Sequence, residues 1–222
     1  MNSTEMLKKI KLFLFDMDGT LYLGNQLYPF TKELLSTIKN QGNRYLFMTN
    51  NSSKSVADYV KKLEKLGISA TKEDFITSSQ ATAYYLKKHH GGATLYVMGT
   101  ESLKAELKSE GFEITEDLDK VDLIVMGFDT ELTFKKLEDV SKLLLTRDIP
   151  YIATNPDLVC PTEFGSVPDC GSVSIMLKNV SGKEPLFNKM ARNIQLSIEE
   201  LCYIFIDNEE LFVQERRNCY YW

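Results

Sequence analysis

The 222-residue chain has little cysteine and no excess of basic residues. Its four cysteines, Cys160, Cys170, Cys202 and Cys219, show no Cys-x-x-Cys spacing, so the sequence predicts neither a zinc site nor a disulfide framework. The formal net charge of −5 argues against a broad nucleic-acid surface, because binding to a phosphate backbone needs clustered basic side chains. Small anionic substrates stay compatible with this charge, since one pocket can be positive on an acidic protein.

Long apolar runs are also missing from the sequence. No stretch approaches the roughly 20 apolar residues of a membrane span, and the first ten residues lack the apolar region of a signal peptide. We therefore expect a cytoplasmic protein without a membrane partner. Hydrophobic residues make up 43% of the chain, which is enough for a globular protein with a buried core. The oligomeric state stays open, a homo-oligomer included.

The first third of the chain alternates predicted strands and helices. The apolar runs Ile10–Phe15, Tyr45–Met48 and Phe75–Thr77 predict three short strands, the first of them buried on both faces of a parallel sheet. The spacing of apolar residues predicts amphipathic helices at Thr31–Lys39 and Val56–Leu66. The order β-α-β-α-β indicates a parallel sheet with right-handed crossovers.

A second α/β series begins near residue 81. Its predicted strands are Thr94–Met98, Leu123–Gly127 and Tyr151–Ala153. They alternate with predicted helices at residues 81–88, Glu101–Ser109 and Phe134–Leu145, and a helix at Ser172–Lys178 leads back to the first unit. We therefore predict a core whose first part is residues 1–80, an inserted α/β unit at residues 81–179, and a second part of the core at residues 180–222.

Two carboxylates follow the first predicted strand. Asp16 and Asp18 would lie on the same side of the emerging chain, and Gly19 allows a tight turn that exposes backbone N–H groups. Ligands of open parallel sheets bind beyond the carboxyl ends of the strands. Two neighbouring carboxylates repel each other unless a cation or proton lies between them, and Mg²⁺ fits that need. The alternative is that both residues merely cap an Asp-Gly turn.

Several phrases of the sequence resemble one known superfamily. The phrase Asp-Met-Asp-Gly-Thr-Leu-Tyr after an apolar strand resembles the nucleophile motif of the haloacid dehalogenase superfamily. Residues 47–53, 74–78, 153–157 and 167–172 extend the resemblance to the branch of NagD-type sugar phosphatases and para-nitrophenyl phosphatases, over roughly residues 8 to 185. The resemblance implies a Rossmann-like parallel-sheet core with a large inserted α/β cap of the C2 type.

The resemblance also implies an activity and residue roles. It implies a phosphomonoester hydrolase that uses Mg²⁺ and acts on a small phosphorylated metabolite such as a sugar phosphate. Asp16 would be the nucleophile that forms an aspartyl-phosphate, Asp18 the acid and then base, and both would ligate the metal. Gly19, Thr49 and Asn50 would bind the phosphate. For Thr49 and Asn50 the alternative is a helix N-cap before residue 56, and both roles are compatible.

On the cap side, the phrase Asn155-Pro156-Asp157 follows a predicted strand. In the branch that the sequence resembles, the cap restricts access and selects the substrate. Asn155, Pro156 and Asp157 are therefore candidates for contact with the substrate. A simple turn explains the phrase almost as well, because Asn, Pro and Asp all favour turns.

The expected lysine of the superfamily, usually in a Gly-Lys-Pro phrase, has no clear counterpart. Lys183, in the phrase Ser-Gly-Lys-Glu-Pro at 181–185, is a candidate for the lysine that binds the phosphate. In a second register this phrase matches an earlier one of the branch, and the lysine segment is deleted between Leu186 and Asn188. Lys183 or Lys189 would then be imperfect substitutes.

The acidic segment of the superfamily is altered as well. The predicted strand Leu201–Ile206 ends at Asp207, which the resemblance makes the third metal ligand, and this strand should lie beside Ile10–Phe15. The second acid is expected near Leu211 or Phe212, and Glu209 and Glu210 are close but out of pattern. The sequence therefore leaves three alternatives: an active phosphatase, a weakened or inactive descendant that retains phosphate and metal binding, and a degraded product without selected activity.

Overall fold

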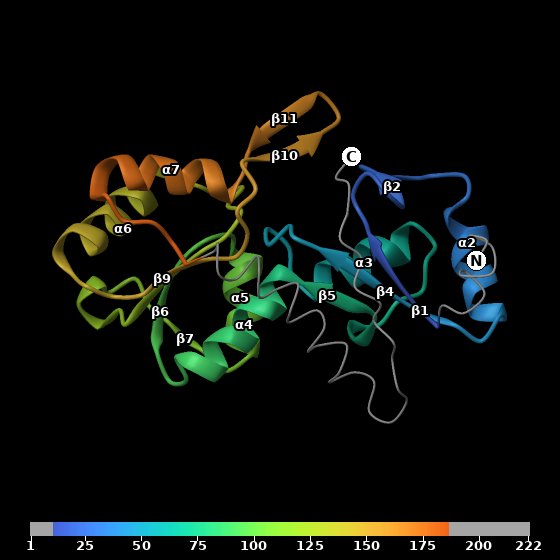
Figure 1. Cartoon of the computed structure of the whole chain (residues 1–222), viewed down its shortest axis with the longest axis horizontal. Helices are drawn as coiled ribbons and strands as arrows, with labels where there is room; N and C mark the ends of the chain where they lie inside the picture. Colours follow the sequence, from blue (N-terminus) through green and yellow to red (C-terminus); the bar gives the residue numbers. More distant parts are fainter. Residues whose placement is uncertain (1–10, 187–222) are drawn as a thin grey trace, which may run out of the picture.

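The computed structural model describes residues 11–186, which contain two separate parallel sheets (Figure 1). The core sheet has the order β1-β4-β5, formed by β1 (Leu12–Asp16), β4 (Arg44–Thr49) and β5 (Phe75–Thr77). The register pairs Asp16 with Met48, so the carboxyl ends of β1 and β4 lie at one edge of the sheet. This parallel α/β arrangement confirms the predicted fold class.

Two helices pack against the core sheet, α2 (Thr31–Asn40) and α3 (Val56–Lys65). Their apolar residues and those of the sheet form one cluster of buried side chains, which includes Leu35, Ile38, Tyr45, Phe47, Val56, Tyr59, Leu63 and Phe75. Helix α3 starts where the sequence favours it, because Ser55 and Asp58 form a capping box. It ends before Gly67, whose φ of +78° suits a residue without Cβ.

The cap sheet has the order β7-β6-β8-β9 and is parallel throughout. Its strands are β6 (Thr94–Met98), β7 (Glu113–Ile114), β8 (Leu123–Met126) and β9 (Tyr151–Ala153). The short strand β7 was not predicted from the sequence. Two single turns of 3₁₀ helix, η1 (Lys72–Asp74) and η2 (Leu118–Lys120), precede β5 and β8.

Helices cover both faces of the cap sheet (Figure 1). On one face lie α4 (Ser78–His89) and α5 (Glu101–Ser109), and on the other lie α6 (Phe134–Thr146) and α7 (Cys170–Ser181). Burial on both faces explains the nearly continuous apolar sequences of these strands. Helix α4 begins three residues before the expected limit of the inserted unit. The boundaries at residues 81 and 179 stay a prediction.

Two hairpins were not predicted. The first, β2 (Tyr22–Leu23) and β3 (Gln26–Leu27), turns at Gly24, whose φ is +57°. The second, β10 (Val159–Thr162) and β11 (Gly165–Pro168), projects from the cap (Figure 1). The Glu163 carboxylate lies against Gly24, so the tip of the second hairpin contacts the turn of the first.

Polar contacts dock the cap onto the loop between β4 and α3. The Ser52 hydroxyl lies 2.8 Å from the Thr154 hydroxyl and accepts a hydrogen bond of 2.8 Å from the Phe128 N–H. Ser52 is fully buried, so these partners satisfy its hydroxyl inside the interface. At the start of α3, the Val56 N–H donates to Glu106 on α5 over 3.2 Å.

Among residues 11–186, none of the helices combines the length and apolar character that crossing a membrane requires.

Candidate active site

A tight loop at the end of β1 presents the carboxylate pair. The Gly19 N–H donates to the Tyr22 carbonyl over 2.8 Å, and the Leu21 N–H donates to the Met17 carbonyl over 2.9 Å. Gly19 has a φ of +85°, a conformation that strongly favours glycine. Because Met17 and Leu21 are fully buried, they fasten the loop to the core while the two acidic residues stay exposed.

The Asp16 carboxylate lies in a mixed environment. Thr20 donates a hydrogen bond of 3.1 Å to Asp16 Oδ2. The side chain is exposed, yet the surrounding chain crowds it enough that burial raises the pKa of Asp16 above its usual range. The hydrogen bonds from Thr20 and Met17 oppose this rise, and the neighbouring charge of Asp18 adds to it. A cation bound beside the pair would relieve the repulsion.

Thr49 and Asn50 follow the neighbouring strand at the same edge of the sheet. Thr49 is buried, and its hydroxyl accepts a hydrogen bond of 3.2 Å from the Asn51 N–H. Asn50 is exposed, and its carbonyl accepts a hydrogen bond of 2.8 Å from the Ser78 hydroxyl. The alternative prediction that Thr49 and Asn50 cap α3 is wrong, because the structure gives that role to Ser55.

The predicted cap residues have different surroundings. Asp157 is partly exposed, and its Oδ2 accepts a hydrogen bond of 3.5 Å from the Asn50 side-chain amide. Asn155 is buried instead, and its Nδ2 donates to Asp157 over 3.1 Å and to Asp169 over 3.2 Å. The Pro156 carbonyl packs against Gly171. Asp157 therefore faces the core, while Asn155 holds it in place from within the cap.

Residues that the sequence did not single out lie beside the carboxylates. The Nζ of Lys62, on α3, lies 3.2 Å from Asp18 Oδ1. Burial lowers the pKa of Lys62, and the Asp18 charge opposes that effect. On β10, burial raises the pKa of Cys160, and the nearby charges of Asp169, Asp18 and Asp157 add to the rise. A lysine at a helix position and a lone cysteine carry no sequence signal that would have identified them.

Comparisons with known proteins agree on one family. Residues 13–113 match the family described as haloacid dehalogenase-like hydrolase. The acid sugar phosphatase of Staphylococcus saprophyticus is 33% identical over 181 residues, which are 82% of this chain and 69% of that protein. The structure of the 4-nitrophenylphosphatase of Thermotoga maritima is 38% identical with a TM-score of 0.76, over 81% of this chain and 68% of that one. The chain belongs to the NagD-type phosphatase branch of the haloacid dehalogenase superfamily.

A further structure similar to this chain contains a metal ion. The glycerol phosphate phosphatase of Mycobacterium tuberculosis was solved in complex with magnesium, and it is 29% identical with a TM-score of 0.72. The match covers 80% of this chain and 54% of that one. The parallel core and inserted cap that the sequence resemblance implied are therefore the architecture of a known phosphatase family.

Lys183 lies away from Asp16 and Asp18. The Lys183 ammonium donates to the Arg147 carbonyl over 2.9 Å and lies 3.5 Å from Asp148 Oδ1. These partners precede β9, whereas Asp157 follows it, so Lys183 lies at the opposite end of that strand. The structure therefore does not bring Lys183 to the carboxylate pair. Lys189 and Asp207 lie outside the described residues.

The donors at the end of β1 fit a magnesium ion. Asp16 and Asp18 supply oxygen ligands, and the exposed position of both leaves room for water and phosphate oxygens. The raised pKa of Asp16 has mutual repulsion among its causes, which a divalent cation would offset. Within residues 11–186, no group of three or more His, Cys, Asp or Glu side chains gathers as a metal site. Asp16 and Asp18 are the donors that the described residues offer at the end of β1.

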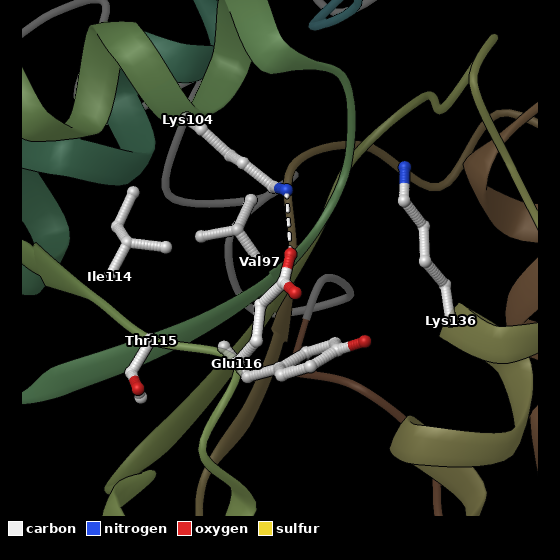
Figure 2. A pocket seen from close by; sticks show the side chains of 7 residues that line it. Val97, Lys104, Ile114, Thr115, Glu116 and Lys136 are labelled. Carbon is white, nitrogen blue, oxygen red and sulfur yellow. Dashed lines mark ion pairs between the residues drawn. The ribbon is translucent and has the colours of Figure 1, made fainter.

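Two hollows elsewhere are not lined by Asp16 or Asp18. A cavity of about 20 Å³ in the cap is lined in part by Lys104, Glu116 and Lys136 (Figure 2). Its volume suits one water molecule. Both lysines already have acidic partners, because the Lys104 ammonium lies 3.5 Å from the Glu116 carboxylate and the Lys136 ammonium lies 2.8 Å from the Asp129 carboxylate. A larger hollow of about 390 Å³ lies between the start of α3, η1 and α5.

Proposed function

We propose that the chain hydrolyses small phosphate monoesters, with Asp16 as the group that accepts the phosphoryl group. The observation that carries this proposal is the carboxylate pair at the end of β1, next to Thr49 and Asn50 at the end of β4, on a haloacid dehalogenase fold. In parallel α/β sheets this edge is where ligands bind. The location therefore supports a reaction at Asp16 rather than a mere turn.

The chemistry would proceed by two displacements at phosphorus. An Asp16 oxygen attacks the phosphorus in line, the bond from phosphorus to the ester oxygen breaks, and Asp18 gives its proton to the leaving oxygen. Asp18 then takes a proton from a water molecule that attacks the phosphorus of the aspartyl-phosphate. Phosphate leaves, and the Asp16 carboxylate is regenerated. Thr49 and Asn50 would hold the phosphoryl oxygens during both steps, whereas the Gly19 N–H already donates to the Tyr22 carbonyl and closes the loop.

Magnesium, bound through Asp16 and Asp18, would supply positive charge against the negative charge of the phosphoryl group. The cap would contribute to selection of the leaving group, because Asp157 on the cap side contacts the Asn50 side-chain amide at 3.5 Å. A carboxylate at that place favours leaving groups that carry hydroxyl groups. Sugar phosphates and glycerol phosphate, which the names of the similar phosphatases mention, have this chemistry.

A second candidate function is phosphate and metal binding with weakened or absent turnover. The placement of Lys183 favours it, because this candidate for the phosphate-binding lysine pairs with Asp148 on the cap instead. Losing one preorganised charge contact can cost on the order of a hundredfold in turnover. The two candidates share one site and differ in rate.

One assay separates these functions. Phosphate release is measured with and without Mg²⁺ on sugar phosphates, glycerol phosphate, nucleotides and para-nitrophenyl phosphate, with Asp16→Asn as the control variant. The proposed hydrolase releases phosphate only with Mg²⁺ and loses this activity in Asp16→Asn. A folded chain that binds phosphate and Mg²⁺ but turns over none of these esters supports the second candidate. A chain that neither binds nor hydrolyses them contradicts both.

A further inference from the structure

The Lys62 ammonium has two neighbours in the candidate active site. It lies 3.2 Å from Asp18 Oδ1 and 3.9 Å from the centroid of the Tyr22 ring. Only 16% of the Lys62 side chain is exposed, against 47% for Asp18. Tyr22 itself is fully buried, so its ring is a fixed surface for the cation. These contacts hold the Lys62 charge beside the Asp16–Thr20 loop rather than in open solvent.

Helix α3 determines this position. Its buried face includes Tyr59 and Leu63, and Lys62 lies three residues after Tyr59 and one before Leu63, at the border of that face. The preceding residue, Lys61, is exposed. Because successive residues of a helix are rotated by about 100°, Lys62 turns toward the loop and Lys61 toward water. Of these two adjacent lysines, only Lys62 lies in the site, so Lys61 can be used as a matched control.

The site needs a positive charge that Lys183 does not supply. Asp16 and an entering phosphate are negative, Asp18 becomes negative once it has given up its proton, and Lys183 pairs with Asp148 on the cap. Among residues 11–186, the Lys62–Asp18 pair is the only ion pair that involves either carboxylate. Because the Asp18 partner is half exposed, the ion pair contributes little to stability, so stabilising the fold does not by itself explain why Lys62 is withdrawn from water here.

We propose that Lys62 is a positioning residue that fixes the Asp18 carboxylate and supplies the positive charge that allows a phosphate anion to bind beside it. This inference rests on the proposed function, since it concerns the same site. In this proposal, Lys62 on helix α3 supplies the positive charge that the superfamily takes from the lysine of its Gly-Lys-Pro segment. Phosphate binding then depends on α3 as well as on the loop that precedes it.

The test measures binding of inorganic phosphate rather than turnover, so that it works on a slow or inactive enzyme. Its dissociation constant is determined by NMR titration of the full chain in saturating Mg²⁺, with the Gly19 amide as the local reporter. Lys62→Met retains the apolar stem and removes the charge, and Lys62→Gln is a second uncharged variant. Lys62→Arg restores the charge, and Lys61→Met is the matched control on the same helix.

We expect Lys62→Met and Lys62→Gln to bind phosphate about tenfold more weakly or worse, because a charge-assisted contact is lost. Lys62→Arg should recover most of the affinity, and Lys61→Met should match the parent, with the melting temperatures of all folded variants close together. Equal phosphate affinity in Lys62→Met and Lys61→Met overturns the inference, as does an Arg variant as weak as the Met variant. If the parent itself binds no phosphate, this inference fails, whereas the proposed function is decided separately by the phosphate-release assay.

Discussion

The side-chain amide of Asn50 lies 3.5 Å from the Asp157 carboxylate, although the two residues are 107 positions apart. Asn50 follows strand β4 of the core sheet, and Asp157 follows strand β9 of the cap sheet. The carboxyl ends of two sheets therefore meet at one site. The core side carries the residues of the proposed reaction, and the cap side is placed to contact the leaving group of the substrate.

This division of roles predicts the effect of changing Asp157. Asp157→Ala should raise the KM for hydroxyl-rich phosphate esters on the order of tenfold and change kcat less, because a charged hydrogen-bond acceptor is lost away from the phosphorus. Steady-state kinetics on the substrate identified by the ester panel measures both constants. Asp119→Ala, an exposed carboxylate of the cap, is the control and should change neither. An equal fall of kcat with unchanged KM would place Asp157 in the chemistry instead.

Docking of the cap depends on Ser52, whose hydroxyl contacts Thr154 and the Phe128 N–H. Ser52→Ala should lower the free energy of unfolding by about 1–3 kcal/mol, because the buried Phe128 N–H loses its partner and the Thr154 hydroxyl keeps only its bond to Asn155. Urea denaturation measures the change. Ser36→Ala removes an exposed hydroxyl that bonds only to the Glu33 carbonyl on its own helix, and it should be nearly neutral. Equal effects of the two variants would contradict the docking role.

The contact between Glu106 and the start of α3 predicts a pH dependence. Burial raises the pKa of Glu106 above its ordinary value of 4.5, although the Val56 N–H opposes the rise. A carboxyl group with a raised pKa in the folded state stabilises the fold at acid pH, and this contribution is lost as pH rises through the shifted value. Glu106→Gln should therefore gain stability relative to the parent between pH 4 and pH 7.

Urea denaturation at both pH values tests this expectation for Glu106. The control is Glu138→Gln, which alters an exposed carboxylate on α6 and should leave the pH dependence as in the parent. A relative loss of stability in Glu106→Gln on going to pH 7 would show that the ionised form is favoured in the fold. The proposed cause of the pKa shift would then be wrong.

Lys183 should be dispensable for the reaction. Its ammonium contacts the Arg147 carbonyl and Asp148, so Lys183→Ala should leave phosphate release unchanged within error. Because the pair is exposed, the cost in stability should be about 1 kcal/mol or less. Phosphate-release assays and thermal unfolding measure the two quantities. A loss of turnover comparable with that of Asp16→Asn would return Lys183 to the active site.

Much of the fold follows from local sequence rules. The apolar run before Asp16 gave a strand at Leu12–Asp16, and the capping residues Ser55 and Asp58 with Gly67 set the limits of α3. The alternation of strands and helices also predicted two α/β units. These features depend on periodicity and on backbone preferences, which neighbouring residues determine.

Features that depend on tertiary position were not predictable in the same way. The β10–β11 hairpin has exposed residues and no Asn-Gly or Asp-Gly turn, so its sequence gives a weak strand signal. Lys62 occupies an ordinary amphipathic position, and only the packing of α3 beside the loop brings it to Asp18. For Lys183, motif spacing suggested a role in the site, whereas the chain path along β9 gave it other partners.

The phosphate-accepting role of Asp16 is tested most directly by chemical trapping. Borohydride reduces an aspartyl-phosphate to homoserine, and peptide mass spectrometry of the enzyme quenched during turnover then identifies the modified residue. We predict homoserine at position 16, dependent on both substrate and Mg²⁺, with Asp18 unmodified and no turnover in Asp16→Asn. Mg²⁺-dependent turnover that persists in Asp16→Asn, with no homoserine at position 16 in the parent, would contradict the proposed mechanism.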